Sequence, residues 1–254
     1  MTNSIFVVEP DWPAPDAIRA AVTTRIGGVS LGQWRGLNLG SHVDDEPDAV
    51  VANRALIRES LSLPSEPVWL NQVHGTSVVE VPLASDHIPN ADASLARQAG
   101  TVCAVMTADC LPLLLCDTRG GEWAAVHCGW RGLCGGIVAQ VVSSFNAAPE
   151  HLLAWMGPAI GPASYQVGSE LREAFVASAT GPLAEQLAGA FAADSNAEGK
   201  YLADLYLLTS TLLQAAGVTA IYGGGFDTYS DPERFYSYRR DGQTGRFASL
   251  IWRE

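Results

Sequence analysis

Three residues of the sequence have the types and positions needed to bind one metal ion. His74 lies in the segment NQVHG, Cys110 in TADCLP and His127 in HCGWRG. Each stands where an apolar run gives way to turn-forming residues, so three distant segments can converge at one rim of a fold. Two imidazoles and one thiolate suit catalytic zinc, which leaves a fourth position to water. From spacing alone, hydrogen-bonded scaffold histidines and a buried thiol are the favoured interpretation.

The segments around the first two of these residues predict how they are positioned. Residues 68–81 have two apolar runs around NQVHG, which predicts a hairpin with His74 at or near its turn. Residues 101–118 have two apolar runs separated by TADCLP, whose proline ends ladder hydrogen bonding. Cys110 is therefore expected at a break between two strands.

The rest of the chain predicts a mixture of strands and helices. Residues 122–145 indicate a strand that ends at His127, a glycine-rich turn and a helix that starts near Gly135. Because strands and helices do not alternate regularly, the mixture favours an α+β fold. Further helices are expected at 48–61, 169–190 and 200–216, and further strands at 17–25, 152–156, 217–225 and 246–252.

The composition indicates one cytoplasmic domain. The 254 residues, 48% of them hydrophobic, suffice to bury a full core without disulfides. No linker-like tract or repeat interrupts them, so a single domain over residues 1–254 is expected. No apolar run approaches the roughly 20 residues of a membrane helix, and the N-terminus lacks the pattern of a secretion signal. We therefore expect no membrane contact and a cytoplasmic location.

The charges and the cysteines narrow the class of ligand. Lys and Arg number 15 against 27 Asp and Glu, and the net charge of −12 repels nucleic acid. A small polar or anionic substrate is expected instead. The five cysteines all lie between Cys103 and Cys134, form no CxxC pair and are odd in number, which indicates reduced thiols rather than a disulfide framework. The pattern gives no oligomeric state.

Seven segments run in order over nearly the whole chain: TTRIGGVSLG, LNLGSHVDDEPDAVVANR, NQVHG, TADCLP, HCGWRG, MGPAIGPASYQVG and FYSYRRDGQTGR. Together they resemble the laccase-domain family, whose members are also named multicopper polyphenol oxidoreductases, purine nucleoside phosphorylases or peptidoglycan editing factors. The resemblance implies a β-sandwich-like core of mixed sheets flanked by helices, similar to the catalytic domain of cytotoxic necrotizing factors. It also implies that His74, Cys110 and His127 bind the metal.

Two polar residues beside the three ligands are candidates for catalysis. Asp109 precedes Cys110 and could accept a proton or steady a histidine ligand, although a turn aspartate is an equally good interpretation. Arg131 follows HCGW and could hold an anion or pair with a carboxylate.

Further polar residues are candidates for substrate binding. Arg25 and Ser30 flank two glycines in a loop that could cradle phosphate, but such a turn is usually only a turn. The amides of NQVHG could recognise a base or sugar, and an arginine cluster near the C-terminus suits one small anion. These last candidates are Asn71, Gln72, Arg239 and Arg240.

The resemblance implies phosphorolysis of adenosine, inosine, guanosine or methylthioadenosine, and deamination of adenosine, at one metal ion. Zinc is the expected metal, and copper could occupy the same site. Five histidines without a His-x-His pair cannot build the usual multicopper cluster, although weak copper-dependent polyphenol oxidation remains an alternative.

Other activities remain open. Cys110 could act as a nucleophile with His127 as base and Asp109 as orienter, in an amide hydrolase. The chain could instead edit peptidoglycan precursors, or bind a ligand without turnover. One departure from the family is Asp227 in GGFDTYSD, where members often carry Cys, which puts any role of that position near the site in doubt.

Overall fold

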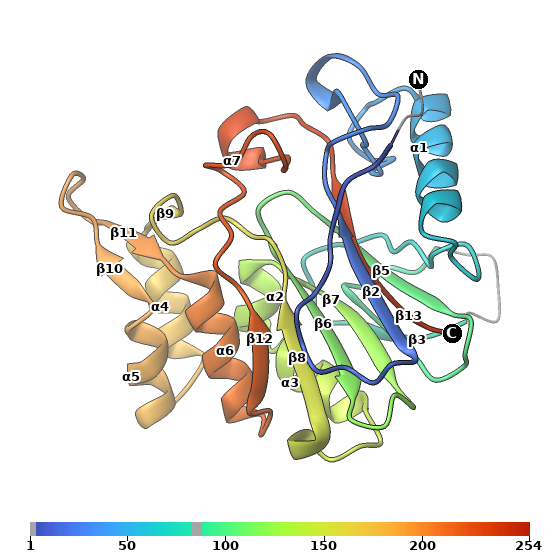
Figure 1. Ribbon diagram of the computed structural model, residues 1–254. Coiled ribbons are helices and arrows are strands. Elements are labelled where there is room, and N and C mark those ends of the chain that lie inside the picture. The colour runs from blue at the N-terminus through green and yellow to red at the C-terminus, as the bar shows by residue number, and fades with distance from the viewer. Residues whose placement is uncertain (1–3, 83–87) are drawn as a thin grey trace.

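The computed structural model describes residues 4–82 and 88–254, in which two β-sheets pack between layers of helices (Figure 1). The larger sheet has six strands in the order β12-β8-β6-β7-β4-β3. In it β6 pairs antiparallel with both β7 and β8, while β3 pairs parallel with β4 and β12 with β8. Its strands are β3 (Val78–Val81), β4 (Ala93–Ala96), β6 (Leu111–Asp117), β7 (Trp123–Cys128), β8 (Leu152–Met156) and β12 (Ala220–Gly223).

The second sheet has four strands, all antiparallel, in the order β1-β2-β13-β5. The C-terminal strand β13 lies between β2 and β5, so the two ends of the chain share one sheet (Figure 1). Its strands are β1 (Val7–Val8), β2 (Ile18–Thr23), β5 (Val102–Thr107) and β13 (Phe247–Arg253). A third, small sheet joins β9 (Gln166–Gly168), β10 (Phe191–Ala193) and β11 (Lys200–Ala203).

Alternate residues along a strand of the large sheets face different layers of the core. In β6, Leu113 and Leu115 belong to the core cluster that faces the helices, whereas Leu114 and Cys116 belong to the cluster between the two sheets. Both faces of β6 are thus buried, which explains its nearly continuous apolar sequence.

The helices cover the outer faces of the two sheets. On the six-stranded sheet lie α2 and α3, followed by α4, α5 and α6, and on the four-stranded sheet lies α1 (Figure 1). The seven α-helices of the described residues are α1 (Pro47–Ser60), α2 (Trp130–Gly135), α3 (Ile137–Ser144), α4 (Ser169–Ala177), α5 (Pro182–Ala188), α6 (Leu205–Ala215) and α7 (Tyr238–Asp241). None of them is long and apolar enough to cross a membrane.

Several predicted elements are confirmed, among them the helix at 48–61, the strand break at Cys110 and the strand that ends near His127. The hairpin at 68–81 is wrong. Val68 forms a parallel bridge with Cys103, and β3 pairs parallel with β4, because the NQVHG turn is bound to the start of β4 and not to its own flank.

The remaining differences lie at glycines and at a helix cap. The helix expected near Gly135 begins earlier, at Trp130, and Gly136 with φ +95° divides it into α2 and α3. Gly181 separates α4 from α5 within 169–190. The segment 200–216 starts as strand β11, and α6 follows after Asp204, whose side chain accepts from Leu207 N–H as an N-cap.

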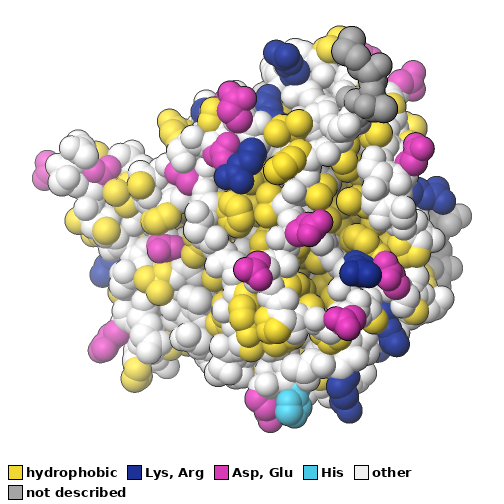
Figure 2. Space-filling view, viewed as in Figure 1, with side chains coloured by type: hydrophobic (Ala, Val, Ile, Leu, Met, Phe, Trp, Pro, Cys, Tyr) yellow, Lys and Arg dark blue, Asp and Glu magenta, His cyan; other side chains and the backbone are white. Residues whose placement is uncertain are grey.

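Figure 2 shows one face of this molecule, on which Lys and Arg side chains are interspersed with Asp and Glu. Among the side chains coloured by type in that view, the basic residues do not join into a continuous surface of the kind that follows a phosphate backbone.

Candidate metal centre

Hairpin β6–β7 brings two of the three candidate ligands together. Its register pairs Leu111 with Cys128 and Pro112 with His127, so Cys110, directly before β6, lies beside the end of β7. At Cys110 the chain passes from β5 in the four-stranded sheet to β6 in the six-stranded sheet. Asp109 makes this crossing with φ +90°, an uncommon conformation for a residue other than glycine.

The third candidate ligand, His74, lies in a turn held by the buried carboxylate of Asp92. His74 N–H donates to Asp92 Oδ1 at 2.9 Å and Gly75 N–H donates to Oδ2 at 2.7 Å. Asp92 Oδ1 also accepts from His127 Nδ1 at 2.8 Å, which leaves Nε2 of that ring for a metal. One carboxylate therefore positions both histidines.

The three ligand atoms lie close enough to share one ion. The ligand atoms of His74, Cys110 and His127 all lie within 4.8 Å of one another, and Cys110 Sγ is 3.9 Å from His74 Nε2. Tetrahedral zinc with its usual bond lengths separates such atoms by about 3.5 Å. The donor set and its spacing thus fit a zinc-like ion with a fourth position open.

A glycine between β7 and α2 makes room for this convergence. A Cβ atom on Gly129 would lie 2.8 Å from Cδ2 of His74, 3.4 Å from Sγ of Cys110 and 3.4 Å from Cε1 of His127. The backbone of Gly129 has ordinary extended angles, φ −68° and ψ 154°. The absent side chain, and not an unusual backbone, is what the site requires here.

The charges of the site favour a thiolate. Burial disfavours the charged form of Cys110, but the neighbouring His127 and hydrogen bonds from both histidines outweigh it and lower the pKa of the thiol to about 6. Burial likewise opposes charge on His127, yet Cys110 and Asp92 raise its pKa to about 9. A thiolate is the form of cysteine that binds metals and that attacks as a nucleophile.

Two of the candidate ligands, His74 and Cys110, open onto a cavity of about 240 Å³ with aromatic, apolar and cationic walls. Arg131 lies over the ring of Trp130, at 4.4 Å, and its guanidinium has no hydrogen-bond partner among the described residues. Arg239 lies over Tyr165 and donates to Gln166 O. The cavity is lined by His74, Ala108, Asp109, Cys110, Trp130, Arg131, Ile160, Tyr165, Leu205, Tyr238 and Arg239.

Asp109 lines this cavity, but its carboxylate is bound on both oxygens. Thr228 Oγ1 donates to Oδ1 at 2.7 Å, and the backbone N–H of Arg239 donates to Oδ2 at 2.6 Å. The carboxylate bound to His127 is Asp92, so the predicted arrangement with Asp109 as orienter of that histidine is wrong. Sequence reasoning missed Asp92 because NADAS contains nothing beyond an aspartate before a strand.

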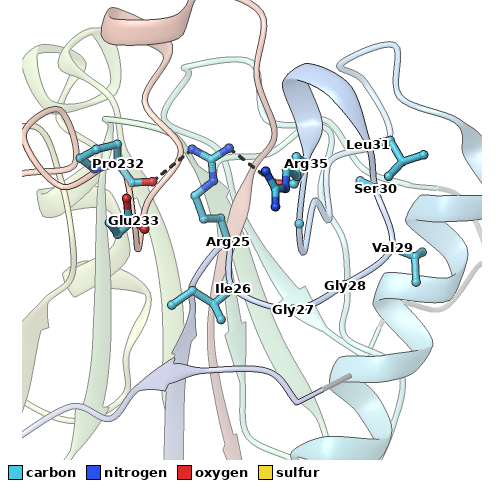
Figure 3. A pocket seen from close by; sticks show the side chains of 11 residues that line it. Arg25, Ile26, Gly27, Gly28, Val29, Ser30, Leu31, Arg35, Pro232 and Glu233 are labelled. Carbon is cyan, nitrogen blue, oxygen red and sulfur yellow. Dashed lines mark hydrogen bonds between the residues drawn. The ribbon is translucent and has the colours of Figure 1, made fainter. Parts of the chain in front are cut away.

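Arg25 and Ser30 lie at a different pocket, of about 540 Å³, whose lining shares no residue with the cavity (Figure 3). Figure 3 shows the Arg25 guanidinium between the carbonyl groups of Pro232 and Arg35, to which it donates at 3.2 and 3.4 Å. Ser30 Oγ donates to Asp45 at 2.6 Å. The two side chains therefore tie this loop together.

The other predicted binding side chains also contact the protein itself. The amide of Asn71 donates to Asn90, and the amide of Gln72 exchanges two hydrogen bonds of 2.8 Å with the backbone of Met106. Arg240 donates to the carbonyl group of Thr228 among others. Of the predicted substrate-binding residues, Arg239 alone lines the cavity beside the ligands.

The position at which the family often has cysteine is also bound within the protein. Asp227 accepts hydrogen bonds from Gly161 N–H at 2.9 Å and Ser164 Oγ at 2.6 Å, and from Tyr229 N–H. It does not line the cavity. In this chain the residue holds the loop that follows β8.

This chain matches known proteins along nearly its whole length. A sequence model of the multi-copper polyphenol oxidoreductase laccase family matches residues 19–254. A purine nucleoside phosphorylase of Pseudomonas aeruginosa is 50% identical over 96% of both chains. Purine nucleoside phosphorylase YfiH of Escherichia coli is 50% identical over 97% of this chain and 98% of its own. The crystal structure of a Neisseria meningitidis protein superposes with a TM-score of 0.91 at 44% identity, covering 98% of this chain and 99% of the other.

Proposed function

The chain belongs to the family of multi-copper polyphenol oxidoreductase laccases, and from this membership and its site we propose that it is a purine nucleoside phosphorylase with one zinc ion held by His74, Cys110 and His127. The observation that carries the proposal is the convergence of these three ligand atoms, with His74 and Cys110 lining a cavity of about 240 Å³. When bound, zinc supplies a fixed positive charge and an open coordination position there.

Phosphorolysis of a nucleoside exchanges one bond for another. An oxygen of phosphate forms a bond to the anomeric carbon of the ribose, and the bond from that carbon to the purine nitrogen breaks. The purine leaves with the bonding electron pair and takes up a proton. The protein must therefore hold an anion beside the sugar and stabilise the departing base.

The cavity walls suit the nucleoside part of this reaction. Tyr165 and Tyr238 offer aromatic faces for a purine, while Ile160 and Leu205 exclude water. Arg131 brings a guanidinium with free donors to the same wall, where negative charge develops on the leaving base.

Asp109 remains the nearest carboxylate in sequence to a ligand, and its role as a proton shuttle is still a prediction. Its bonds to Thr228 and to the backbone of Arg239 favour a different part, in which it holds the wall formed by Tyr238 and Arg239.

A product assay tests the proposal. Zinc-loaded protein is incubated with inosine or adenosine, with and without phosphate, and the products are separated by chromatography. We expect hypoxanthine from inosine only when phosphate is present, and loss of both bound zinc and activity in Cys110→Ala. Inosine formed from adenosine without phosphate would add deamination. Absence of every one of these products from metal-loaded protein would refute the nucleoside function, and full activity after chelation would refute the metal.

A second function is favoured by one observation, the chain of contacts from Cys110 through His127 to Asp92. A thiolate, an imidazole and a carboxylate in this order are the arrangement of cysteine hydrolases that cleave amides. Muropeptide precursors that carry Ser in place of Ala are the substrates to test for an editing hydrolase. Hydrolysis of such a precursor by metal-free protein, abolished when Cys110 is alkylated, would replace the first proposal by this one.

A further inference from the structure

Two arginines and a histidine gather around one short backbone segment, Leu39–Gly40, and we call them, after the two arginines, the cationic cluster: His42, Arg54 and Arg246. Leu39 C=O accepts from Arg54 Nε at 3.0 Å and from Nη2 at 2.8 Å. Leu39 N–H donates to Arg246 O at 3.0 Å, and the side chain of Arg246 packs against Gly40 so closely that a Cβ there would lie 2.9 Å from its Cγ.

Both arginines of the cationic cluster are partly buried without a carboxylate partner. Arg54 lies over Trp69 at 4.2 Å, and Arg246 donates through Nη1 to the carbonyl groups of Thr244 and Gly245. Among the described residues neither forms an ion pair; Glu66, the carboxylate that acts on Arg54, accepts instead from Trp69 Nε1.

Such an arrangement is unusual in a chain with 27 acidic and 15 basic residues. Burial of a cation is costly unless an anion or good hydrogen bonds compensate it, and burial lowers the pKa of both Arg54 and Arg246. Nη1 of Arg54 and both Nε and Nη2 of Arg246 have no hydrogen-bond partner in residues 4–82 and 88–254. Two guanidinium groups with free donors and no ion-paired carboxylate among the described residues are suited to an anion from outside.

The cationic cluster lies beside the metal centre. The pKa of His42 is lowered by burial, then by Arg246 and Arg54, and further by His127 and His74. Arg246 in turn interacts with Cys110 and Asp109, and its guanidinium lies 5.9 Å from the ring of Tyr238 in the cavity wall. None of the three residues lines the cavity, but an anion bound by Arg246 would lie near the part of the cavity wall that Tyr238 forms.

We propose that His42, Arg54 and Arg246 form the binding site for a tetrahedral oxyanion, the phosphate that attacks the nucleoside. This inference rests on the proposed phosphorolysis, because it gives that reaction its second substrate. It also assigns phosphate to a place other than the glycine-rich loop of Arg25 and Ser30, whose polar groups are already bound to protein atoms. Planar guanidinium groups hold phosphate oxygens in pairs, which a single exposed lysine does not.

Direct binding tests the site without any turnover. Inorganic phosphate is titrated into the zinc-loaded protein by calorimetry, for the wild type and for Arg246→Gln, Arg246→Lys and His42→Gln. We expect the dissociation constant of phosphate to rise about tenfold or more in Arg246→Gln and His42→Gln, with partial recovery in Arg246→Lys. The side chain of His42 has no hydrogen-bond partner in the described part of the chain, so its substitution should not disturb folding.

The matched control is Arg35→Gln, which removes the same charge from an exposed residue of the glycine-rich loop. It should leave phosphate binding unchanged. Three outcomes would overturn the inference. The wild type fails to bind phosphate, or binding is lost in Arg35→Gln alone, or all variants bind phosphate equally, which would mean that the metal alone binds it. Inosine monophosphate serves as a second titrant: dependence on the cluster for this ester but not for free phosphate would also overturn it.

Kinetics separate this inference from the function on which it rests. With inosine saturating, the KM for phosphate should rise in Arg246→Gln and His42→Gln while the KM for inosine at saturating phosphate changes little. Phosphorolysis with an unaltered phosphate KM would leave the function in place and refute the site. If phosphate binding depends on the cluster but the protein never converts a nucleoside, the site is supported and the proposed phosphorolysis is refuted.

Discussion

Asp92 connects the two histidines of the metal centre through a single buried carboxylate. Both of its oxygens accept from N–H groups, one from His127 Nδ1 and His74 N–H and the other from Gly75 and Val73. Such outer partners fix the ring orientation of a ligand and raise its basicity. Burial raises the pKa of Asp92, but the hydrogen bonds from His127 and from the backbone of Gly75 outweigh it, so the pKa is lowered below its usual value.

Replacing Asp92 by asparagine should therefore weaken metal binding. An amide has one acceptor where the carboxylate has two, so an NH₂ group would face an N–H donor. We expect the zinc dissociation constant to rise about 10- to 100-fold, measured by competition with a chromophoric chelator. Asp16→Asn, at an exposed position, is the control. Unchanged zinc affinity in a folded Asp92→Asn protein would show that the carboxylate does not position the ligands.

Asp227 gives a prediction about stability and pH. Burial raises the pKa of this carboxyl, but hydrogen bonds from Ser164 and Gly161 outweigh it and the pKa is lowered. A carboxylate with a depressed pKa in the folded state stabilises the protein above its unfolded pKa of about 3.9, and this stabilisation is lost as the pH falls through the folded value.

Accordingly, Asp227→Ala should lower the free energy of unfolding at pH 7 by about 1 kcal/mol, since the group is only partly buried. The difference from the wild type should shrink below about pH 4. Denaturant unfolding at several pH values measures it, with the exposed Asp11→Ala as control. A difference that persists undiminished at acid pH would mean that the carboxylate charge is not the cause.

At the scale of elements, the turn from β7 to α2 allows a prediction about zinc binding. Gly129→Ala is compatible with the backbone angles, yet its Cβ would press on all three candidate ligands. We expect zinc affinity to fall about tenfold or more, while the thermal stability of the metal-free protein stays close to that of the wild type. Gly121→Ala, whose Cβ would meet only ordinary contacts, is the control. Equal zinc binding by both variants would contradict the geometry of this turn.

The elements near the site were predicted where local patterns decide them. The break at Cys110 follows from a proline after a short polar stretch, and the helix expected at 48–61, found at Pro47–Ser60, follows from the spacing of its apolar residues. The wrong prediction of a hairpin at 68–81 shows where local sequence patterns no longer decide the pairing of strands. Its two apolar runs suit antiparallel pairing, but parallel pairing of β3 with β4 depends on Asp92, which is distant in sequence from the first run.

Only some residues of the candidate site were predicted from the sequence. His74, Cys110 and His127 were found through family resemblance, and hairpin β6–β7 explains why two of them meet. The polar groups of Arg25 and Ser30 suited a phosphate cradle in the sequence, but their partners, Pro232 and Asp45, come from other segments. Sequence spacing does not contain such partners.

For the whole molecule, β13 is the strand on which the four-stranded sheet depends. Its residue Ser249 pairs with Val22 on one side and Val105 on the other, and its buried hydroxyl has no hydrogen-bond partner within the described protein. Ser249→Pro should cost about 3 kcal/mol or more, because proline removes a ladder bond in a central strand. Ser249→Ala should be neutral or stabilising, since it removes an unsatisfied hydroxyl.

Thermal unfolding followed by circular dichroism measures both Ser249 variants. A stable Ser249→Pro protein would mean that β13 is not held from both sides, and a strongly destabilised Ser249→Ala protein would mean that the hydroxyl has a partner after all.

The crossing of the chain at Cys110 has a consequence for the order in which the protein assembles. Cys110 and His127 are joined by one hairpin, a local structure that forms early, whereas the His74 turn, bound to Asp92 before β4, arrives only with the less local pairing of β4 with β7. A folding chain therefore offers a metal two ligands first and the third later. We expect the ion to bind tightly only at the last of these steps, so that its binding energy stabilises the docking of residues 68–75 and not the hairpin.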